Sequence, residues 1–364
     1  MPANLMKGNE ALAEGAVRAG CRFFAGYPIT PQSEIAHYLS KRLPETGGVF
    51  IQAESETAAI NMIYGAAGAG ARALTASSSP GISLKQEGIS YLAAAELPCV
   101  IANIARGGPG LGGIQPAQSD YFQATKGGGH GDYRLIVLAP ASAQEMFSLT
   151  VRAFNLADRY RIPVLILSDG ILGQMMEPVV LDNSPGPETF AKNWATTGMM
   201  GQRGPNSIYT LYLDPEQLER HNIHLQAKYR LIVQSETEAV MEQVQDADVL
   251  LVAYGIAARI AKAAVKQTRR LGIKTGLIRP ITLWPFPSQA IFGAARANTR
   301  LLVIELSAGQ MVEDVRLAAP AGTPVHFHGR TGGMVPSVDE IVTVIRKLAD
   351  IGDDIDESFT AVVD

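Results

Sequence analysis

The chain has 364 residues, of which 47% are hydrophobic and 18% charged, so it is long enough to bury a sizeable core and to form about two domains. Its formal net charge of −4 provides no basic surface for nucleic acid, which we exclude as a main partner. Two cysteines, Cys21 and Cys99, are too few for a disulfide framework or an iron–sulfur site built from this chain alone. We therefore expect a cytoplasmic protein, with neither a signal peptide nor a membrane span.

The first part of the chain, from Lys7 to about Val180, alternates helix-like and strand-like segments at the spacing of βαβ units. This alternation predicts an α/β fold with a doubly wound parallel sheet in a first domain of residues 1–184. The expected helices are Asn9–Ala19, Gln32–Arg42, Glu56–Ala66 and Ala141–Arg159. The expected strands are Arg22–Gly26, Val49–Gln52, Leu74–Ser77, Val100–Ala105 and Val164–Ser168.

The middle of the chain, residues 185–234, loses this alternation and is rich in Gly, Pro, Asn and Thr. We expect an irregular extension there, suited to wrap around a neighbouring subunit. A second alternating unit, residues 235–350, predicts a smaller α/β domain, and residues 351–364 an acidic exposed tail. Its expected helices are Glu236–Gln245, Ala257–Leu271, Ser288–Ala297 and Ser337–Leu348. Its expected strands are Val249–Ala253, Lys274–Ile278, Leu301–Glu305 and Val325–His328.

The segment Gly108–Gly113 has the G-x-G-x-x-G pattern of a dinucleotide-binding loop and follows an expected strand. Pro109 inside the tight turn, and the lack of an acidic strand end about 20 residues on, argue against NAD. The alternative is a glycine-rich loop that lets the backbone approach a ligand or another subunit closely.

Two carboxylates, Glu54 and Glu56, lie at an expected strand-to-helix junction, where Ser55 is a plausible N-cap. An acidic residue in a first turn stabilises the helix dipole, which is a purely structural explanation. Residues 58–71 carry no other acidic group, however, so the junction is expected to be buried. A buried carboxyl needs a partner, which favours a chemical role.

Two further features lie at the ends of expected strands. Thr30, in the segment Tyr27–Ser33, offers a hydroxyl at the carboxyl end of a strand, or an N-cap ahead of Pro31. Arg106 is the only cation between Lys85 and Lys126 and directly follows an apolar strand. An isolated arginine of this kind is either an anion clamp or one half of a structural salt bridge.

The six histidines are scattered, and none of them forms a pair with the spacing of a zinc protease. His326 and His328 fall on the same face of one expected strand, which favours a place in the core. We predict no metal site in this chain.

Four segments together resemble the α subunit of the 2-oxoacid:ferredoxin oxidoreductases, and the similarity covers nearly the whole chain. They are GYPITPQSEI, QAESETAAINMIYGAAGAGARALTASSSPGISL, IARGGPGLGGIQPAQSDYFQATKGGGHGDYR and ELSAGQMVEDVR. The chain is most similar to the separate-subunit enzymes that act on branched-chain 2-oxoacids such as 2-oxoisovalerate, or on 2-oxoglutarate. The resemblance implies a pyrimidine-type thiamine-diphosphate-binding domain followed by a domain like the transketolase C-terminal one.

The resemblance also implies roles for individual residues. Glu56 matches the glutamate that hydrogen-bonds N1′ of the cofactor's aminopyrimidine, and is thus the expected catalytic residue. Arg106 matches the arginine that holds the substrate carboxylate, and Thr30 matches a hydroxyl that faces the substrate. The resemblance further implies cofactor contacts at Pro28, Ile29 and Ser79, and secondary roles for Gln118 and Asp120.

By the same resemblance, the Mg²⁺ and diphosphate motif and the [4Fe–4S] clusters belong to partner subunits: β, γ and a ferredoxin-like δ. The implied reaction converts a 2-oxoacid, CoA and oxidised ferredoxin into acyl-CoA, CO₂ and reduced ferredoxin. Two alternatives stay open: a non-catalytic scaffold subunit of the same fold, and an NAD-linked or transketolase-like enzyme.

Overall fold

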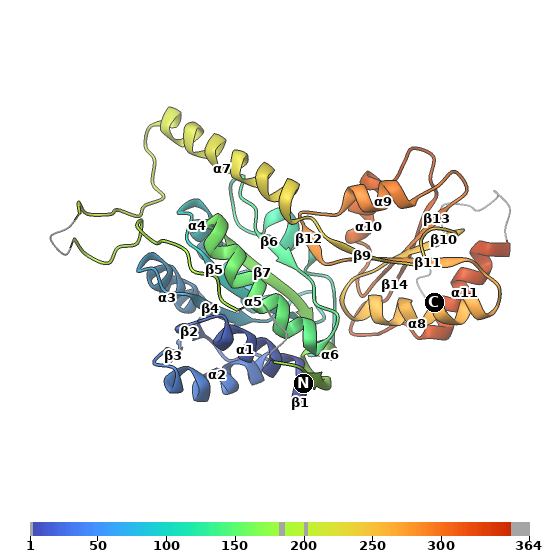
Figure 1. Cartoon of the computed structure of the whole chain (residues 1–364), viewed down its shortest axis with the longest axis horizontal. Coiled ribbons are helices and arrows are strands. Elements are labelled where there is room, and N and C mark those ends of the chain that lie inside the picture. Colours follow the sequence, from blue (N-terminus) through green and yellow to red (C-terminus); the bar gives the residue numbers. More distant parts are fainter. Residues whose placement is uncertain (1–2, 182–185, 200–202, 351–364) are drawn as a thin grey trace.

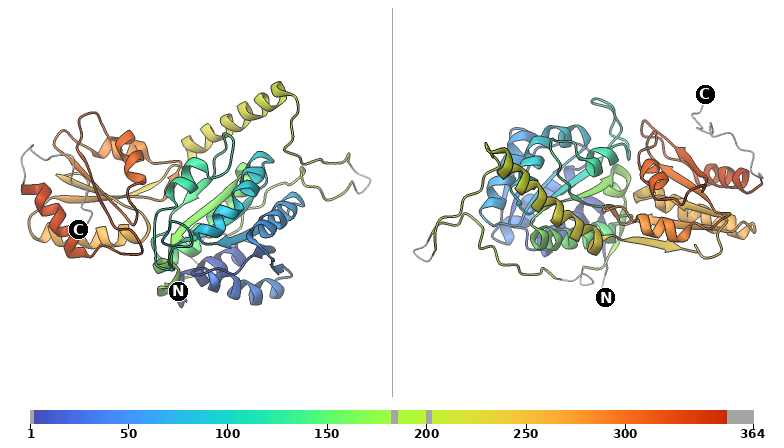
Figure 2. Two further views of the ribbon diagram at one scale, coloured as in Figure 1. Left: turned by 180° about the vertical axis from the view of Figure 1, so that it is seen from behind. Right: turned by 90° about the horizontal axis from the view of Figure 1, so that it is seen from above.

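The computed structural model describes residues 3–181, 186–199 and 203–350. Two α/β units lie side by side along the long axis of the molecule, and an extended arm projects from the first unit in every view (Figures 1 and 2). None of the helices in these described ranges is both long and apolar enough to cross a bilayer.

The first unit is built on a seven-stranded sheet with the order β12-β6-β7-β5-β4-β2-β3. Its strands pair in parallel, except β12, which joins β6 in antiparallel fashion. The strands are β2 (Phe23–Gly26), β3 (Val49–Gln52), β4 (Ala73–Ser77), β5 (Cys99–Ala105), β6 (Ile136–Leu138), β7 (Pro163–Asp169) and β12 (Thr282–Trp284). Every residue of β4, β5 and β7 is buried, as expected for strands covered on both faces.

Helices cover both faces of this sheet and bury separate apolar clusters. The cluster on one face contains α1 (Gly8–Arg18), α2 (Ser33–Glu45) and α5 (Ala143–Tyr160). The cluster on the other face contains α3 (Glu56–Gly68) and α4 (Ser79–Ala94) and continues into the second unit. The remaining elements of this unit are α6 (Gly170–Gln174), a π-helical turn η1 (Gln123–Gly127), and the antiparallel pair β1 (Asn4–Lys7) and β8 (Met176–Val179).

The order of the strands creates a switch point between β2 and β4. The chain runs from β2 outward to β3 and then crosses to β4 on the other side of β2. In open α/β sheets, ligands bind at the carboxyl ends of the strands where the order reverses. The loops that follow β2, β4 and β5 meet at this edge.

The second unit has a five-stranded sheet with the order β14-β13-β10-β11-β9. Its strands are β9 (Ala239–Glu242), β10 (Val249–Val252), β11 (Thr275–Pro280), β13 (Arg300–Glu305) and β14 (Val325–Gly329). Its helices are α8 (Gly255–Arg270), α9 (Ser288–Ala294), α10 (Met311–Ala318) and α11 (Val338–Asp350). Because β12 leaves this unit to extend the first sheet, the two units share backbone hydrogen bonds.

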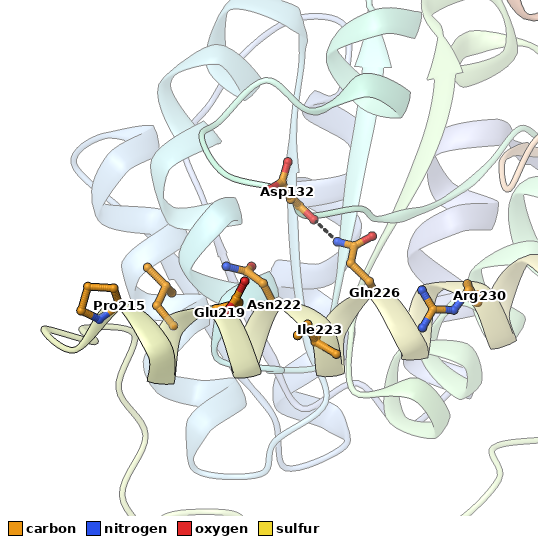
Figure 3. Close-up of a pocket in the computed structure, with 8 residues that line it drawn as sticks. Asp132, Pro215, Glu219, Asn222, Ile223, Gln226 and Arg230 are labelled. Carbon is orange, nitrogen blue, oxygen red and sulfur yellow. Dashed lines mark hydrogen bonds between the residues drawn. The ribbon is translucent and has the colours of Figure 1, made fainter.

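A long helix, α7 (Pro215–Glu236), corrects the expectation that residues 185–234 are irregular throughout. Asp214 caps this helix, with its side chain accepting from the Glu216 N–H at 3.0 Å, and Pro215 occupies the first helical position. The helix lies along the first unit, where Gln226 Nε2 donates to the Asp132 carbonyl at 2.8 Å (Figure 3). The chain before α7 first packs against the first unit, where the Thr196 N–H donates to the Gly68 carbonyl at 2.9 Å, and then projects as the arm (Figure 1).

The expected helix Glu236–Gln245 is wrong, because residues 239–242 form the edge strand β9. Val240 pairs with Arg279 of β11, so sheet pairing overrides the helix propensity of this glutamate-rich segment. The other expected helices and strands are present, with shifts of up to a few residues at their ends. The domain boundaries at 184 and 234 stay predictions, and residues 351–364 lie outside the described residues.

Candidate functional site

A cleft of about 610 Å³ opens at the switch-point edge of the first sheet, between the two units. Loops of both units line it. The first unit contributes Ser79, Arg106 and Asp120, and the second unit contributes Ser307, Gln310 and Thr331. A site of this kind depends on how the two units are held together.

Glu56 begins α3 and is 7% exposed, whereas Glu54 is exposed. Ser55 caps the helix, with its Oγ accepting from the Ala58 N–H at 3.1 Å. The Glu56 carboxyl lies against Gly81 in the first turn of α4: a Cβ at Gly81 would be 2.7 Å from Glu56 Oε1. The glycine therefore leaves room for the carboxyl, just behind the residues of α4 that line the cleft.

Two hydroxyl groups at the end of β4, Ser77 Oγ and Ser78 Oγ, are buried and have no hydrogen-bond partner among the described residues. The same Cβ at Gly81 would lie 2.1 Å from Ser77 Oγ, so this hydroxyl and the Glu56 carboxyl share one small space. Buried polar groups are usually hydrogen-bonded, so an unpartnered hydroxyl next to a buried carboxyl requires an explanation. Together the Glu56 carboxyl and the Ser77 hydroxyl can accept and donate hydrogen bonds to a ligand.

Ser79 and Asp120 belong to a polar network at the ends of β4 and β5. Ser79 Oγ donates to Asp120 Oδ2 at 2.7 Å and accepts from the Arg106 N–H at 3.0 Å. Asn103 Nδ2 donates to the same Asp120 oxygen at 2.8 Å. Burial raises the pKa of Asp120 above its ordinary value, and the hydrogen bonds from Ser79 and Asn103 oppose that rise. The network fixes Asp120 at the wall of the cleft.

Arg106 is 7% exposed, and its guanidinium is held by backbone oxygens. Nη1 donates to the Thr30 carbonyl at 2.8 Å and Nη2 to the Leu111 carbonyl at 3.1 Å, whereas the buried Nε has no partner. No carboxylate of the described residues forms a salt bridge with Arg106, which removes the structural ion pair that the sequence left open. Its charge is therefore available to an anionic ligand.

The glycine-rich segment after Arg106 folds back on itself and does not open a helix. Gly113 N–H donates to the Gly107 carbonyl at 2.9 Å, and Arg106 forms an isolated β-bridge with Pro116. A Cβ at Gly112, where φ is +58°, would lie 1.8 Å from the Gly107 oxygen, so only glycine fits. A dinucleotide fingerprint requires a helix N-terminus at this point, so the segment is a close-approach loop.

The loop after β2 carries three expected site residues. Thr30 and Pro28 are exposed and Ile29 is half-buried. The N-cap of α2 is Gln32, so the alternative role of Thr30 as a helix cap is wrong. The Thr30 carbonyl accepts from Arg106, which links this loop to the glycine-rich loop.

Gln118 lies deeper and connects the two units. Its Nε2 donates to the Tyr254 carbonyl at 2.9 Å, and its Oε1 accepts from the Leu306 N–H at 3.0 Å. Tyr254 Oη in turn donates to the Gln118 carbonyl at 3.2 Å. The side chain is 2% exposed, so it supports the wall of the cleft from behind.

Three buried ionisable residues near this edge were not predicted. Asp169 ends β7 and caps α6 through the Ile171 N–H at 2.9 Å, and burial raises its pKa to about 6. Glu305 ends β13 and caps α10, accepting from the Val312 N–H at 2.9 Å. The sequence signal for both is a carboxylate directly after an apolar strand. Lys85, in the middle of α4, has no such signal and is wholly buried.

In the described ranges, no group of three or more His, Cys, Asp or Glu side chains is arranged to hold an ion. His328 is buried and its Nε2 hydrogen-bonds Glu340 Oε1 at 2.9 Å, as expected for a core histidine.

Two family models cover most of the chain. The model described as pyruvate flavodoxin/ferredoxin oxidoreductase, thiamine diphosphate-binding, matches residues 14–247. The model described as pyruvate:ferredoxin oxidoreductase core domain II matches residues 247–341.

Two relatives match this chain over nearly their whole length. The ketoisovalerate oxidoreductase subunit VorB of Methanothermobacter marburgensis is 50% identical over 349 residues, which is 96% of this chain and 99% of that protein. The 2-oxoglutarate synthase subunit KorA of Methanothermobacter thermautotrophicus is 38% identical over 371 residues, covering 94% of this chain and 98% of that protein.

Solved structures agree in fold. The 2-oxoglutarate:ferredoxin oxidoreductase of Magnetococcus marinus, with 2-oxoglutarate, coenzyme A and succinyl-CoA bound, superposes with a TM-score of 0.85 at 28% identity. The match covers 95% of this chain and 65% of that one. A split-gene transketolase matches at 15% identity with a TM-score of 0.56 and shares the fold alone.

Proposed function

We propose a function from the premise that this chain belongs to the α-type subunits of the 2-oxoacid:ferredoxin oxidoreductases. As such a subunit, it takes part in the oxidative decarboxylation of a 2-oxoacid with CoA to acyl-CoA, CO₂ and reduced ferredoxin. The observation that carries the proposal is Glu56, a buried carboxyl that shares one small space with the unpartnered Ser77 hydroxyl at the switch point of the sheet.

Thiamine diphosphate fits the groups around Glu56, and when bound it supplies a nucleophilic carbon and an electron sink for decarboxylation. Glu56 would hold a proton at its carboxyl oxygen, shared with the N1′ position of the pyrimidine ring. Pro28, Ile29 and Ser79 would form the adjoining walls for the cofactor. The cofactor's diphosphate and its Mg²⁺ would be held by a partner subunit.

Arg106 would bind the carboxylate that the reaction removes, because its charge is not neutralised by a carboxylate within the described residues and its Nε lacks a partner. Thr30 would face the same substrate, with Gln118 and Asp120 supporting the pocket as secondary residues. Fixing the carboxylate before its loss places the reacting carbon in a defined position.

The substrate that we propose is a branched-chain 2-oxoacid such as 2-oxoisovalerate, ahead of 2-oxoglutarate. Arg106 is the one cation among the described residues that line the cleft, which suits a substrate with a single carboxylate. 2-Oxoglutarate has a second carboxylate and would need a second cationic partner. The identity of 50% to a ketoisovalerate oxidoreductase subunit, against 38% to a 2-oxoglutarate synthase subunit, agrees with this choice.

The [4Fe–4S] clusters would belong to partner subunits, which we propose are β, γ and a ferredoxin-like δ, with ferredoxin as the electron acceptor. Cys21 and Cys99 are both buried as free thiols, and burial raises the pKa of Cys21 to about 12, so neither is suited to bind a cluster. Tyr209, Leu211 and Leu213 on the arm are more than half exposed and would contact a neighbouring subunit. Free thiols and a ferredoxin-linked reaction agree with a cytoplasmic location.

The test is Glu56→Gln in the assembled complex, assayed with 2-oxoisovalerate and with 2-oxoglutarate, CoA and a viologen acceptor. General acid–base catalysis typically contributes about 10²- to 10⁴-fold, so turnover should fall by this factor without a loss of thermal stability. The matched control is Glu54→Gln, two residues away and exposed, which should keep normal turnover. Near-normal turnover in Glu56→Gln would favour a scaffold subunit, and nicotinamide reduction would favour an NAD-linked enzyme.

A further inference from the structure

Asn103 is a polar residue inside the buried strand β5, and its side chain is 1% exposed. Because side chains alternate along a strand, Asn103 lies on the same face as Ile101 and Ala105, which both belong to the apolar cluster that contains α3 and α4. A buried amide costs free energy unless its polar atoms form hydrogen bonds. The partners of Asn103 therefore explain why an amide interrupts this apolar row.

Both polar atoms of the Asn103 side chain are hydrogen-bonded to residues of the cleft. Oδ1 accepts from the Ser79 N–H at 3.1 Å, and Nδ2 donates to Asp120 Oδ2 at 2.8 Å. Ser79 and Asp120 line the cleft, and Asn103 lies in the sheet behind them. One buried amide thus holds two residues of the cleft wall.

The hydrogen bond to Ser79 also anchors the start of α4. The first N–H groups of a helix have no partner within the helix, and the side chain of the N-cap residue usually accepts from one of them. Ser78 occupies the N-cap of α4, but its side chain forms no capping hydrogen bond. The Asn103 amide accepts from the first N–H of the helix instead, so a side chain of the neighbouring strand fixes the point where α4 begins.

Ser79 connects Asn103 to Arg106. The Ser79 Oγ donates to Asp120 Oδ2 at 2.7 Å and accepts from the Arg106 N–H at 3.0 Å. The backbone of Arg106 is therefore held by a hydroxyl whose own backbone is held by Asn103. Since Arg106 begins the glycine-rich loop of the cleft, the position of this loop depends on the same network.

We propose that Asn103 is a positioning residue, whose buried amide fixes the backbone of Arg106 through Ser79 and so places the guanidinium for the substrate carboxylate. This inference rests on the function proposed above for Arg106. Asn103 itself does not touch the substrate. A binding group that is held in place before its ligand arrives loses less conformational freedom on binding, so we expect the effect of Asn103 in the affinity for the 2-oxoacid.

The first test is Asn103→Leu, which removes both hydrogen bonds with a side chain of similar size. In the assembled complex, the KM for 2-oxoisovalerate should rise by about 10-fold, as for the loss of one orienting hydrogen bond. The KM values for CoA and for the viologen acceptor should change little. Without turnover, hydrogen–deuterium exchange followed by mass spectrometry should become faster in residues 104–115, where the Arg106 N–H loses its fixed partner.

The matched control is Asn155→Leu on α5, on the other face of the sheet. Asn155 is also buried, and its amide bonds Arg72 and the backbone of Gly186 and Glu188. Both substitutions leave buried groups without partners and should lower the melting temperature. The control should leave the KM for 2-oxoisovalerate and the exchange of residues 104–115 unchanged.

A reversed pair tests the hydrogen bond between Asn103 and Asp120 and also applies if Asn103→Leu does not fold. Asn103→Asp places two carboxylates in contact and should raise both the KM for 2-oxoisovalerate and the exchange of residues 104–115. Adding Asp120→Asn restores one donor and one acceptor in the opposite order. The double variant should therefore lower both quantities again.

An unchanged KM for 2-oxoisovalerate in an intact Asn103→Leu complex would overturn the inference even if the melting temperature falls, because Asn103 would then only contribute to the stability of the core. The inference would also be overturned if the double variant kept the high KM of Asn103→Asp. The proposed function fails by different results, namely normal turnover in Glu56→Gln or an unchanged KM for the 2-oxoacid in Arg106→Lys.

Discussion

Arg106 illustrates how a charged side chain is prepared for a ligand by its own backbone. Two of its N–H groups are used by the Thr30 and Leu111 carbonyls, which orient the guanidinium plane without neutralising it. A guanidinium can then add a carboxylate through its remaining N–H groups, with both charge and geometry in place. The two carbonyls belong to two different loops, so the same arginine also sets the distance between them.

Arg106→Lys should raise the KM for every 2-oxoacid by about 10-fold or more, because hydrogen bonds to charged groups contribute about 1.5–3 kcal/mol and lysine lacks the planar fork. The KM values for CoA and ferredoxin should change little. Steady-state kinetics of the assembled complex measure all three. An unchanged KM for the 2-oxoacid in an intact complex would remove Arg106 from the substrate site, whereas a parallel rise in all three constants would indicate a structural role.

The burial of Lys85 predicts how the stability of the folded chain changes with pH. Its pKa is about 8 in the folded chain against an ordinary value of 10.5, so the folded state binds fewer protons than the unfolded state between these pH values. Stability therefore rises with pH across this window, by about 3 kcal/mol if the full difference is realised. Thermal melting from pH 7 to 10.5 should show a Tm that rises relative to Lys85→Met. If the Tm of the unchanged chain and the Tm of Lys85→Met depend on pH in the same way, the lowered pKa of Lys85 is contradicted.

At the scale of elements, the close approach of α3 and α4 positions Glu56 beside the cleft. Gly88 of α4 packs against Ile60 of α3, where an added Cβ would lie 2.5 Å from Ile60 Cγ2. Gly81, which is nearer the start of α4, makes the corresponding close contact with the Glu56 carboxyl. Two glycines on one face of α4 thus allow a helix spacing that larger residues would widen.

Gly88→Ala should destabilise the chain by about 1–3 kcal/mol, the usual effect of overpacking a well-filled core. The matched control is Gly65→Ala on the exposed side of α3, where an added Cβ meets nothing within 4 Å. That substitution should stabilise by about 0.5–1 kcal/mol, since alanine favours the helix over glycine. Urea unfolding of the two variants provides the comparison, and equal effects of both would show that α3 and α4 are not in close contact.

The local sequence pattern does not predict two of the elements, α7 and β9. The buried apolar residues of helix α7 are Leu225, Tyr229 and Ile232, a narrow stripe that is obscured by exposed apolar residues such as Ile223 and Leu231. Its start was readable from Asp214 and Pro215, which are typical of an N-cap and a first helical position. Strand β9 was not readable, because its conformation depends on pairing with β11, about 37 residues further along the chain.

The candidate site was more predictable than these elements, for a topological reason. Glu56, Thr30 and Arg106 each follow a strand of one parallel sheet, and the carboxyl ends of such strands meet at one edge. Lys85 could not be found in this way. Its burial results from the packing of α4 on α3 and β4, which no local pattern records.

At the scale of the whole molecule, the cleft depends on how the two units are joined, through a shared sheet as well as through contacts between side chains. β12 extends the first sheet from within the second unit, and Tyr121 and Tyr254 contact each other across the boundary with ring centroids 6.0 Å apart. Gln310 Nε2 of the second unit donates to the Ser119 carbonyl at 2.7 Å. These contacts position the loops of the second unit over the residues at the ends of β4 and β5.

Gln118→Leu tests the contact between the two units most directly. The single side-chain amide of Gln118 in the first unit hydrogen-bonds two buried backbone groups of the second unit. Removing it leaves the Tyr254 carbonyl and the Leu306 N–H without their partner, and each unsatisfied buried group costs about 1–3 kcal/mol. The variant should melt at a lower temperature, and small-angle X-ray scattering should show a larger radius of gyration as the units separate. Gln289→Leu, at an exposed position of α9, is the control and should change neither quantity. If Gln118→Leu melts normally and keeps its radius, the cleft does not depend on this amide, and a direct role of Gln118 toward the ligand becomes the stronger explanation for its position.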